Sequence, residues 1–217
     1  MLLKNFTLIN RNITMNTKLK ETIESVAKLE IPENRKEILN PFIEYLNEKI
    51  SKNEKIAINF ICTHNSRRSH LGQIWTQTLA KYLNLDTITT YSGGTENTAV
   101  ATPIIKTLSN QGFAITKLSE NNNPIYAISY DENTHPIIGF SKKYHDEFNP
   151  TSNFAAIMTC SEADGGCPFV AGSEKRIPIT YEDPKIADNT DLEQQTYTER
   201  SNQIASEMYY VLSHLKQ

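Results

Sequence analysis

A cysteine and an arginine stand six positions apart in the stretch INFICTHNSRRSHLGQIW, residues 58–75. Cys62, Arg68 and Ser69 there form the pattern Cys-x5-Arg-Ser. A thiolate is a strong nucleophile, and the planar guanidinium group binds two oxygens of an anion at once, which lysine cannot do. We therefore expect Cys62 to attack the central atom of a tetrahedral oxyanion that Arg68 holds, with Ser69 as a hydrogen-bond partner of the sulfur. A buried cysteine beside solvent-facing arginines is the alternative.

The flanking segments place this motif at a junction between a strand and a helix. The apolar run 55–61 predicts a strand, and the apolar residues of 69–83 recur at helical spacing. The loop between them consists of Thr63, His64, Asn65, Ser66 and Arg67. Its backbone N–H groups and the N-terminus of the helix can converge on an anion, and the same field favours a thiolate over a thiol. We expect this loop to bind the oxyanion.

Two further cysteines occupy the stretch MTCSEADGGCPF, residues 158–169. Cys160 follows the buried-strand pattern of 153–159, so we expect it at the same edge of the sheet as Cys62. Cys167 lies seven positions later, across a loop whose glycines let it change shape. A thiol that reaches an adduct on Cys62, backed by a second thiol that reaches the first, can carry out disulfide exchange. Two ordinary cysteines, at a strand end and in a loop, are the alternative.

The stretch YEDPK, residues 181–185, places an acid shortly before the last predicted helix. Asp183 in this stretch is a candidate general acid, which would protonate a leaving oxygen at the anion site. Asp-Pro is also an ordinary turn sequence, and this is the alternative interpretation.

Strands and helices alternate from residue 55 onward. Strands are predicted at 55–61, 87–93, 153–159 and 176–180, and helices at 69–83, at 98–111 and from about 190 to the end. Thr190 and Glu193 form a capping-box pattern at the start of the last helix. The alternation predicts an α/β fold, a doubly wound parallel sheet with helices on both faces. We assign residues 55–217 to this catalytic domain.

Two regions lie outside the alternating pattern. Residues 17–51 read as two helices interrupted at Pro32, a helical hairpin that packs on the rest of the molecule, and we assign 1–54 to this extension. The region 119–152 holds two strand-like runs, PIYAISY and HPIIGF, and a short helical turn at KKYHDEF. We interpret it as an insertion on one rim of the sheet.

Composition and charge exclude several classes of partner. The 217 residues carry a formal net charge of −3 with a pI of about 6.0, which gives no large basic surface for nucleic acid or an anionic membrane. No apolar run approaches the ~20 residues of a membrane span. The opening MLLKNFTLINRNIT lacks the features of a signal peptide, and Met15 is a second candidate start. Three cysteines are too few for a secreted disulfide framework, so we expect a cytoplasmic protein.

We expect neither a metal site nor a cofactor from the residues themselves. His64 and His70 are two metal-ligating side chains close in sequence, which raises the question of zinc. A zinc site needs three or four protein ligands, and no third and fourth ligand stands at a suitable spacing.

The three motifs, in this order, resemble the low-molecular-weight protein tyrosine phosphatase superfamily, and most closely its thioredoxin-coupled arsenate reductases. The matching residues are Cys62, Arg68 and Ser69 of the phosphate-type loop, Asp183 and Pro184 of a late Asp-Pro pair, and Cys160 and Cys167 of the reductases' redox pair. The resemblance covers roughly residues 55–217 apart from the insertion at 119–152. It implies a four-stranded parallel sheet flanked by helices.

The resemblance also implies a reaction. Cys62 attacks arsenate held by the loop amides and Arg68, while Asp183 assists the departure of water or hydroxide. Cys160 then attacks the sulfur of the Cys62–arsenic adduct, which releases arsenite and forms a Cys62–Cys160 disulfide. Cys167 takes over Cys160, and the loop between these two cysteines rearranges to present the new disulfide to thioredoxin.

The sequence departs from the family at several positions. His64 and Arg67 stand where relatives often carry glycine and a smaller residue, which predicts a more crowded and more basic loop entrance. In some reductases a potassium ion lies beside the loop. Asn65 and Ser92 match two of its ligands, but Gln73 stands where a carboxylate is expected, so the resemblance implies a weak potassium site at most.

Three functions remain open. Arsenate reduction with thioredoxin as reductant is the leading hypothesis. The nearest rival is a phosphatase acting on phosphotyrosine or small phosphomonoesters through a phosphocysteine, for which Cys62, Arg68 and Asp183 suffice. Family tyrosine phosphatases usually follow Asp-Pro with aromatic residues, whereas Lys185 and Ile186 follow here, which favours the reductase. The third is a redox-sensing or oxyanion-binding interaction protein, and the N-terminal hairpin leaves a homodimer open.

Overall fold

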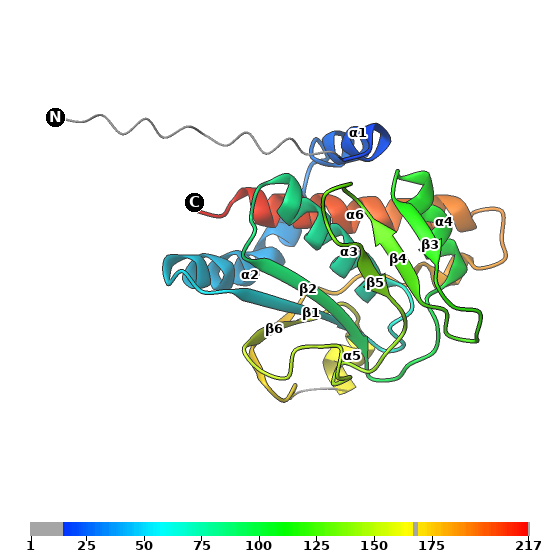
Figure 1. The fold of residues 1–217 in the computed structure, drawn as a ribbon. Coiled ribbons are helices and arrows are strands. Elements are labelled where there is room, and N and C mark those ends of the chain that lie inside the picture. Colours follow the sequence, from blue (N-terminus) through cyan, green and yellow to red (C-terminus); the bar gives the residue numbers. More distant parts are fainter. Residues whose placement is uncertain (1–14, 167–168, 217) are drawn as a thin grey trace.

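The structure, a computed structural model, describes residues 15–166 and 169–216. Cys167 therefore lies outside the described residues. The elements, in chain order, are α1 (Thr17–Val26), α2 (Glu33–Ser51), β1 (Ile56–Cys62), α3 (Arg68–Tyr82), β2 (Ile88–Gly94), α4 (Thr102–Asn110), β3 (Ala114–Lys117), β4 (Tyr126–Ser129), β5 (Ile137–Gly139), β6 (Phe154–Met158), α5 (Ser161–Gly166), β7 (Ser173–Pro178), the 3-10 helix η1 (Pro184–Ala187) and α6 (Glu193–Ser213). Figure 1 shows their arrangement.

Four parallel strands form the main sheet in the order β2-β1-β6-β7. This confirms the predicted α/β fold with a parallel sheet flanked by helices. β1 pairs with β2 on one side and with β6 on the other, so the chain leaves the end of β1 at a point where the strand order reverses. Loops diverge at such a point and leave room for a ligand. The loop after Cys62 begins there.

The helix boundaries differ from the sequence prediction at two places. α4 begins at Thr102 rather than near residue 98, because the chain before it is extended as far as Ala101. The prediction of a capping box at the start of α6 is wrong. Thr190 accepts a hydrogen bond from the Leu192 N–H, and the Glu193 carboxylate accepts one from the Asn189 N–H, so the two side chains bind the preceding turn and not each other's N–H groups.

The region 119–152 forms part of a second, antiparallel sheet and then an irregular segment. β4 and β5 pair antiparallel, as predicted, and β3, which the sequence does not predict, pairs with β4. The helical turn predicted at residues 142–148 is wrong, because this segment lies in turns. A parallel bridge between Gly94 and Lys143 fastens it beside the end of β2.

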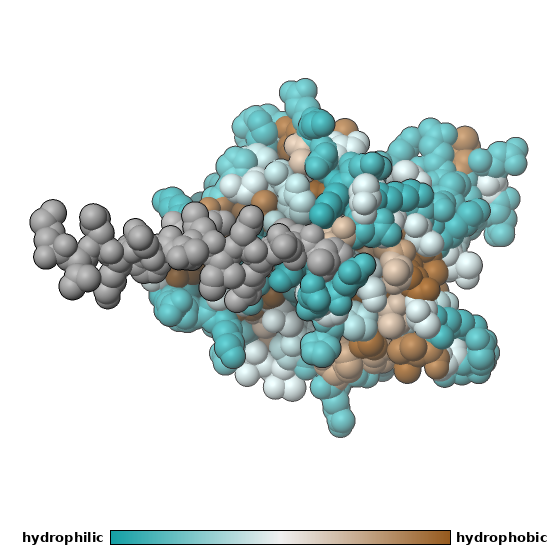
Figure 2. All heavy atoms as spheres, turned by 45° about the horizontal axis from the view of Figure 1, so that its top comes forward, coloured by the Kyte–Doolittle hydropathy of each residue, from teal (hydrophilic) through white to brown (hydrophobic). Residues whose placement is uncertain are grey.

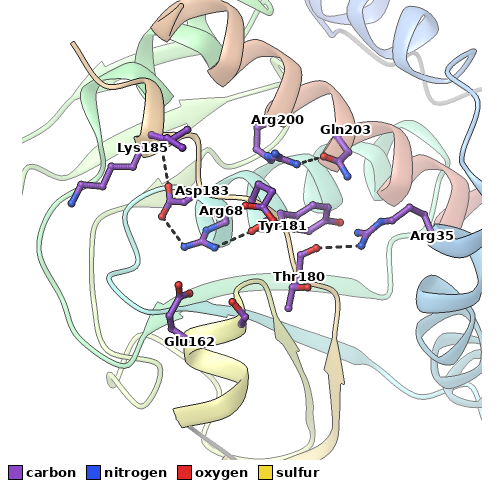
Figure 3. Close-up of a pocket in the computed structure, with 12 residues that line it drawn as sticks. Arg35, Arg68, Glu162, Thr180, Tyr181, Asp183, Lys185, Arg200 and Gln203 are labelled. Atoms are coloured by element: carbon purple, nitrogen blue, oxygen red, sulfur yellow. Dashed lines mark hydrogen bonds and ion pairs between the residues drawn. The ribbon is translucent and has the colours of Figure 1, made fainter. Parts of the chain in front are cut away.

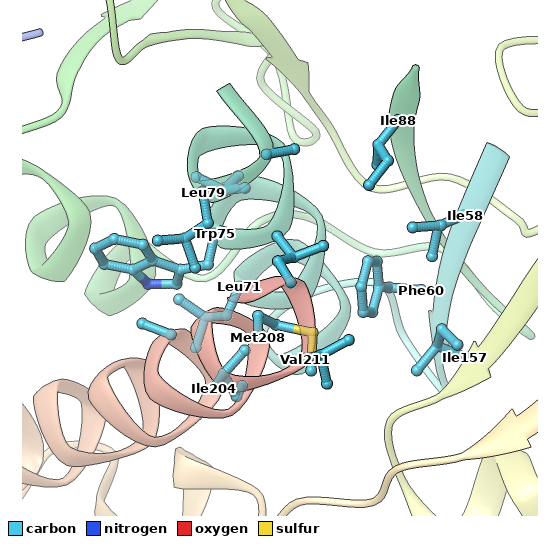
Figure 4. Packing of buried hydrophobic residues seen from close by; sticks show 14 of the residues in the cluster. Ile58, Phe60, Leu71, Trp75, Leu79, Ile88, Ile157, Ile204, Met208 and Val211 are labelled. Atoms are coloured by element: carbon cyan, nitrogen blue, oxygen red, sulfur yellow. The ribbon is translucent and has the colours of Figure 1, made fainter. Parts of the chain in front are cut away.

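Most buried apolar side chains lie in one cluster between the main sheet and helices α1, α2, α3, α4 and α6. Figure 4 shows Phe60 of β1, Trp75 of α3 and Met208 of α6 among them. The Trp75 ring meets Phe113 edge-on at 5.1 Å between centroids, and its Nε1–H donates to Ser201 Oγ at 2.8 Å. The polar atom of this large buried ring is therefore satisfied.

The N-terminal helices share this cluster. Leu19 of α1 and Leu39 and Leu46 of α2 are fully buried in it. Both helices pack on α6, where Arg35 forms a two-bond ion pair with Glu207, with N–O distances of 2.8 and 2.7 Å. The predicted packing role of these helices is confirmed, whereas a homodimer stays a prediction.

The opposite face of the main sheet carries a smaller cluster. It contains Ile61, Cys62, Met158 and Cys160, with Ala163 as the contribution of the short helix α5. Helices thus lie on both faces of the sheet, but one face is covered by α1, α2, α3, α4 and α6 and the other by the short α5. The two cysteines belong to the thinner layer.

One face of the molecule can be followed in Figure 2. On the face in Figure 2, hydrophilic side chains surround smaller apolar patches. Within the described residues, no helix is long and apolar enough to cross a membrane.

Gly72 of α3 provides a test of the packing between this helix and the sheet. A Cβ atom at Gly72 would lie 2.4 Å from Cδ1 of the buried Phe60 ring. We expect Gly72→Ala to lower the free energy of unfolding by about 1–3 kcal/mol through overpacking, although alanine favours helices. Gly165→Ala in α5 is the matched control, since nothing lies within 4 Å of its Cβ position. Equal urea-unfolding curves for the two variants would contradict the packing argument.

Candidate active site

Cys62 ends β1 as a buried residue, and the oxyanion loop, residues 63–67, leads directly into α3. Cys62 Sγ lies 3.1 Å from Ser69 Oγ. Asn65 Nδ2 donates to the same Ser69 oxygen at 2.8 Å. Because Ser69 Oγ already accepts this hydrogen bond, its own proton is free to point at the sulfur, where it would stabilise a thiolate. The motif thus lies at the expected strand-to-helix junction.

Asn65 shapes the oxyanion loop. It has a φ of 44°, in the left-handed region that asparagine tolerates better than most residues. Its Oδ1 accepts the backbone N–H of Lys142 at 2.9 Å, and Ser141 Oγ donates to the His64 carbonyl at 2.9 Å. A Cβ atom at Gly94 would lie 2.7 Å from the Asn65 nitrogen, so only glycine allows β2 to end this close. Through Ser141 and Lys142, the segment after β5 therefore packs against the oxyanion loop and holds it in place.

Arg68 and Asp183 come together, although 115 positions separate them. Arg68 Nη2 lies 2.7 Å from Asp183 Oδ2, and Nη1 donates to the Tyr181 carbonyl at 2.9 Å. Figure 3 shows the guanidinium between these two partners. Arg68 Nε is buried and has no hydrogen-bond partner among the residues that the structure describes. Asp183 therefore lies against the guanidinium of Arg68, and it also begins η1, because its Oδ1 accepts the Lys185 N–H at 3.0 Å.

The sequence predicts that Arg67 helps to bind the oxyanion, but its guanidinium group contacts Tyr197 and Asp188. Its Nε donates to Tyr197 Oη at 2.6 Å, and its Nη2 lies 2.7 Å from Asp188 Oδ2. Tyr197 in turn donates to Asp188 Oδ1 at 2.5 Å. Burial and the hydrogen bond to Asp188 raise the pKa of Tyr197, so it remains a neutral phenol that can donate. We call Arg67, Asp188 and Tyr197 the Arg67 clamp; it fastens the oxyanion loop to α6.

Cys160 lies beside the oxyanion loop. It is fully buried directly after β6, with its sulfur 3.4 Å from Thr63 Oγ1 and 3.4 Å from the Ala163 nitrogen. Thr63 is the neighbour of Cys62, and both cysteines belong to the thinner cluster. The structure thus brings Cys160 to the loop, as its position after a strand predicts. Its second partner, Cys167, is outside the described residues.

His64 and His70 have different surroundings. His70 is fully buried with Nδ1 3.4 Å from Ser92 Oγ, and burial, with a smaller effect of Lys142, lowers the pKa of His70 to about 3. It is therefore neutral. His64 is half exposed, 3.6 Å from Glu96. The described residues contain no group of three or more histidine, cysteine, aspartate and glutamate side chains that could hold a metal.

A cavity of about 670 Å3 opens beside Arg68 and Asp183 (Figure 3). Its walls come from α2, α3, α5, α6 and the segment around η1, and they are largely charged. The lining residues include Arg35, Glu162, Glu182, Lys185 and Arg200. The cavity exceeds the size of one oxyanion and could accommodate a polar group attached to it.

Several site residues carry no sequence signal. Ser141 and Lys142 lie in the insertion, and Asp188 and Tyr197 lie outside every motif. Each reaches the loop through contacts between segments far apart in the chain. Spacing rules do not detect such contacts, so an alignment of related sequences would be needed to find them.

Neither a family model nor a curated protein matches the sequence. Among solved structures, the chain is similar to a low-molecular-weight phosphotyrosine phosphatase from Vibrio cholerae O395, with 12% identity, a TM-score of 0.47, and coverage of 73% of this chain and 94% of that one. It is also similar to a low-molecular-weight protein tyrosine phosphatase from T. tengcongensis, with 13% identity, a TM-score of 0.48, and coverage of 74% and 99%. An arsenate reductase from Archaeoglobus fulgidus has 15% identity, a TM-score of 0.42, and coverage of 70% and 98%. These similarities do not separate the two activities.

The buried neutral His70 predicts a pH effect on stability. Its pKa is about 3 in the folded protein against an ordinary 6.5. Below pH 6.5 the unfolded chain binds a proton that the folded protein does not, so the free energy of unfolding falls as the pH falls toward 3. We expect His70→Gln to reduce the slope between pH 5 and 6 by about 1 kcal/mol per pH unit, measured in urea titrations. An unchanged slope for His70→Gln would refute the assignment.

The Arg67 clamp predicts a large effect of one hydroxyl group. Tyr197→Phe leaves Arg67 Nε and one Asp188 oxygen without their partner, so we expect the free energy of unfolding to fall by about 1–3 kcal/mol. Tyr209→Phe on the same helix is the control, because none of the described contacts involves its hydroxyl group, and it should change stability by less than about 0.5 kcal/mol. Thermal unfolding measures the stability of both variants. An unchanged stability of Tyr197→Phe would show that the clamp does not hold the loop.

Proposed function

We propose that this protein reduces arsenate through a nucleophilic Cys62 and a disulfide relay from Cys62 through Cys160 to Cys167. The observation that carries the proposal is the position of Cys160. Its buried sulfur lies 3.4 Å from Thr63 Oγ1, next to the cysteine that Ser69 contacts at 3.1 Å. A hydrolase needs no second thiol at this place.

The first step is attack of the Cys62 thiolate on arsenic. The loop amides, from Thr63 to Arg67, would hold the oxyanion, and Arg68 would exchange its bond to Asp183 for bonds to two oxygens of the anion. A sulfur–arsenic bond forms and an arsenic–oxygen bond breaks. Asp183, once released from Arg68, would carry the proton that lets the departing oxygen leave as water.

The second step reduces arsenic. The Cys160 thiolate attacks the Cys62 sulfur, a disulfide bond forms, and the electron pair of the sulfur–arsenic bond stays on arsenic, which leaves as arsenite. Register supports this step. Ile61 pairs with Met158, so continuing the two parallel strands sets Thr63 beside Cys160. Cys62 is thus diagonal to Cys160 rather than directly opposite it, and the two Cα atoms lie farther apart than the ~4.8 Å between neighbouring strands.

The third step returns Cys62 to its thiolate form. The Cys167 thiolate attacks the Cys160 sulfur, and the resulting disulfide accepts two electrons from a dithiol partner of the thioredoxin class. Cys160 is fully buried, so an external thiol cannot reach it directly. Transfer of the disulfide to Cys167 would move the oxidising equivalent away from the buried Cys160, and the electrons of the partner would enter through Cys167.

A phosphatase is the second candidate, favoured by the cavity beside Arg68 and Asp183. Its volume of about 670 Å3 suits a phosphomonoester with a leaving group. The charged walls, with Glu162, Lys185 and Arg200, suit a polar leaving group better than a phenyl ring. Cys62 would then form a phosphocysteine that water hydrolyses.

Replacing Cys160 separates the two functions. Cys160→Ser should abolish arsenate turnover in the presence of a thioredoxin system, because no sulfur then attacks the adduct. It should spare cleavage of p-nitrophenyl phosphate, which needs only Cys62, Arg68 and Asp183. Arsenite release and p-nitrophenol formation are the two measurements.

Cys62→Ser is the companion variant and should abolish both activities. Absence of arsenate turnover by the wild-type protein, with retained phosphate-ester cleavage, would establish the phosphatase instead. Arsenate turnover by Cys160→Ser at the wild-type rate would eliminate the relay.

A further inference from the structure

Lys142 is a buried lysine in the segment behind the oxyanion loop. Only 2% of it is exposed, and its Nζ has no hydrogen-bond partner among the described residues. The ammonium lies 4.6 Å from the centroid of the Phe140 ring and 5.4 Å from that of Phe148. Burial lowers the pKa of Lys142 to about 8, which the carboxylate of Asp146 opposes. Aromatic faces compensate part of the cost of a buried cation, but they neutralise no charge.

The main chain fixes this lysine against the loop. Its N–H donates to Asn65 Oδ1 at 2.9 Å, and its carbonyl accepts the Gly94 N–H at 2.9 Å. The preceding Ser141 holds the His64 carbonyl. Lys142 therefore cannot shift without moving Asn65, whose amide holds Ser69.

The charge of the ammonium also acts on the first turn of α3. Its charge contributes to the lowered pKa of His70, which directly follows Ser69. His70 is neutral, and the described residues place no carboxylate within ion-pair distance of Lys142 Nζ. In a low-dielectric region a charge with no ion-pair partner interacts strongly with an anion nearby, even where a more distant carboxylate such as Asp146 acts on it as well.

Two of the three expected potassium ligands are engaged. Asn65 Oδ1 accepts the Lys142 N–H, and Ser92 Oγ lies 3.4 Å from His70 Nδ1. Position 73 offers a neutral glutamine whose Nε2 donates to the Thr90 carbonyl and whose Oε1 is buried without a partner among the described residues. One free oxygen is too few to hold a potassium ion.

We propose that Lys142 is a positioning residue, a cation tethered to the back of the oxyanion loop in place of a bound metal ion. Its main chain holds Asn65, and its ammonium favours an anion in the loop. The proposal deepens the proposed function and depends on the same oxyanion site. It applies equally to arsenate and to phosphate esters.

Sulfate is a suitable probe, because it binds an oxyanion loop without reacting. Alkylation of Cys62 by iodoacetamide, followed by peptide mass spectrometry, measures how much sulfate protects the thiol in wild type, Lys142→Met and Lys142→Arg. We expect Lys142→Met to need roughly three- to tenfold more sulfate for half protection, and Lys142→Arg to stay near wild type. Lys143→Met, at the exposed neighbouring lysine, should have no effect.

The role of the charge would be overturned if sulfate protected Cys62 equally in wild type and Lys142→Met. It would also be overturned if Lys142→Met and Lys142→Arg lost the same amount of protection. Absence of protection in the wild-type protein would overturn the oxyanion site itself, and with it the proposed function. Arsenate turnover is not part of this measurement, so the two failures remain distinguishable.

A second measurement needs no variant and decides the matter even where Lys142→Met fails to fold. Protection of the wild-type protein by sulfate should be the same in sodium, potassium and tetramethylammonium salts at equal ionic strength. A saturable gain in potassium alone would show that the loop takes up an ion and that Lys142 does not replace it.

Discussion

The geometry of the site depends on one buried amide group, the side chain of Asn65. Its backbone adopts a left-handed conformation that closes the oxyanion loop, its Nδ2 donates to Ser69 Oγ, and its Oδ1 accepts from Lys142. A single side chain thus joins the loop, the start of α3 and the segment after β5. Aspartate could not donate to Ser69, and glutamine is longer by one methylene. The Ser69 hydroxyl beside Cys62 is therefore oriented by a group whose length and two polar ends both matter.

Two consecutive arginines fasten the opposite side of the loop. Arg67 reaches Asp188 and α6, whereas Arg68 reaches Asp183 at 2.7 Å. The segment of η1 lies between the two carboxylates, so the loop and the acid are held as one unit. Arg67 Nε also lies 3.9 Å from Asp183 Oδ1, but its shorter contacts are with Tyr197 and Asp188, at 2.6 and 2.7 Å. The two adjacent arginines therefore have different closest partners.

The sequence predicts the parts of this site that depend on local pattern. Cys62 and Arg68 could be placed because strand and helix periodicities meet around them, and Cys160 because it follows a buried run. The orientation of Arg67 could not be predicted, since adjacent residues in an irregular loop point in directions that no periodicity specifies. The role proposed for Lys142 could not be predicted from the sequence either. A lysine side chain is normally exposed to solvent, whereas this one is buried with Phe140 and Phe148 packed around its ammonium group.

The unequal layers on the two faces of the main sheet have a consequence for motion. The thick layer under α3 and α6 holds β1 through extensive apolar burial, whereas the layer with Cys62 and Cys160 has α5 as its helix and few apolar residues. The free energy of a local opening follows the apolar contacts that it breaks. Amide hydrogens of α5 should therefore exchange with solvent far sooner than those of α3. The face with Cys62 and Cys160 could therefore change its conformation while the packing on the other face of the sheet stays intact.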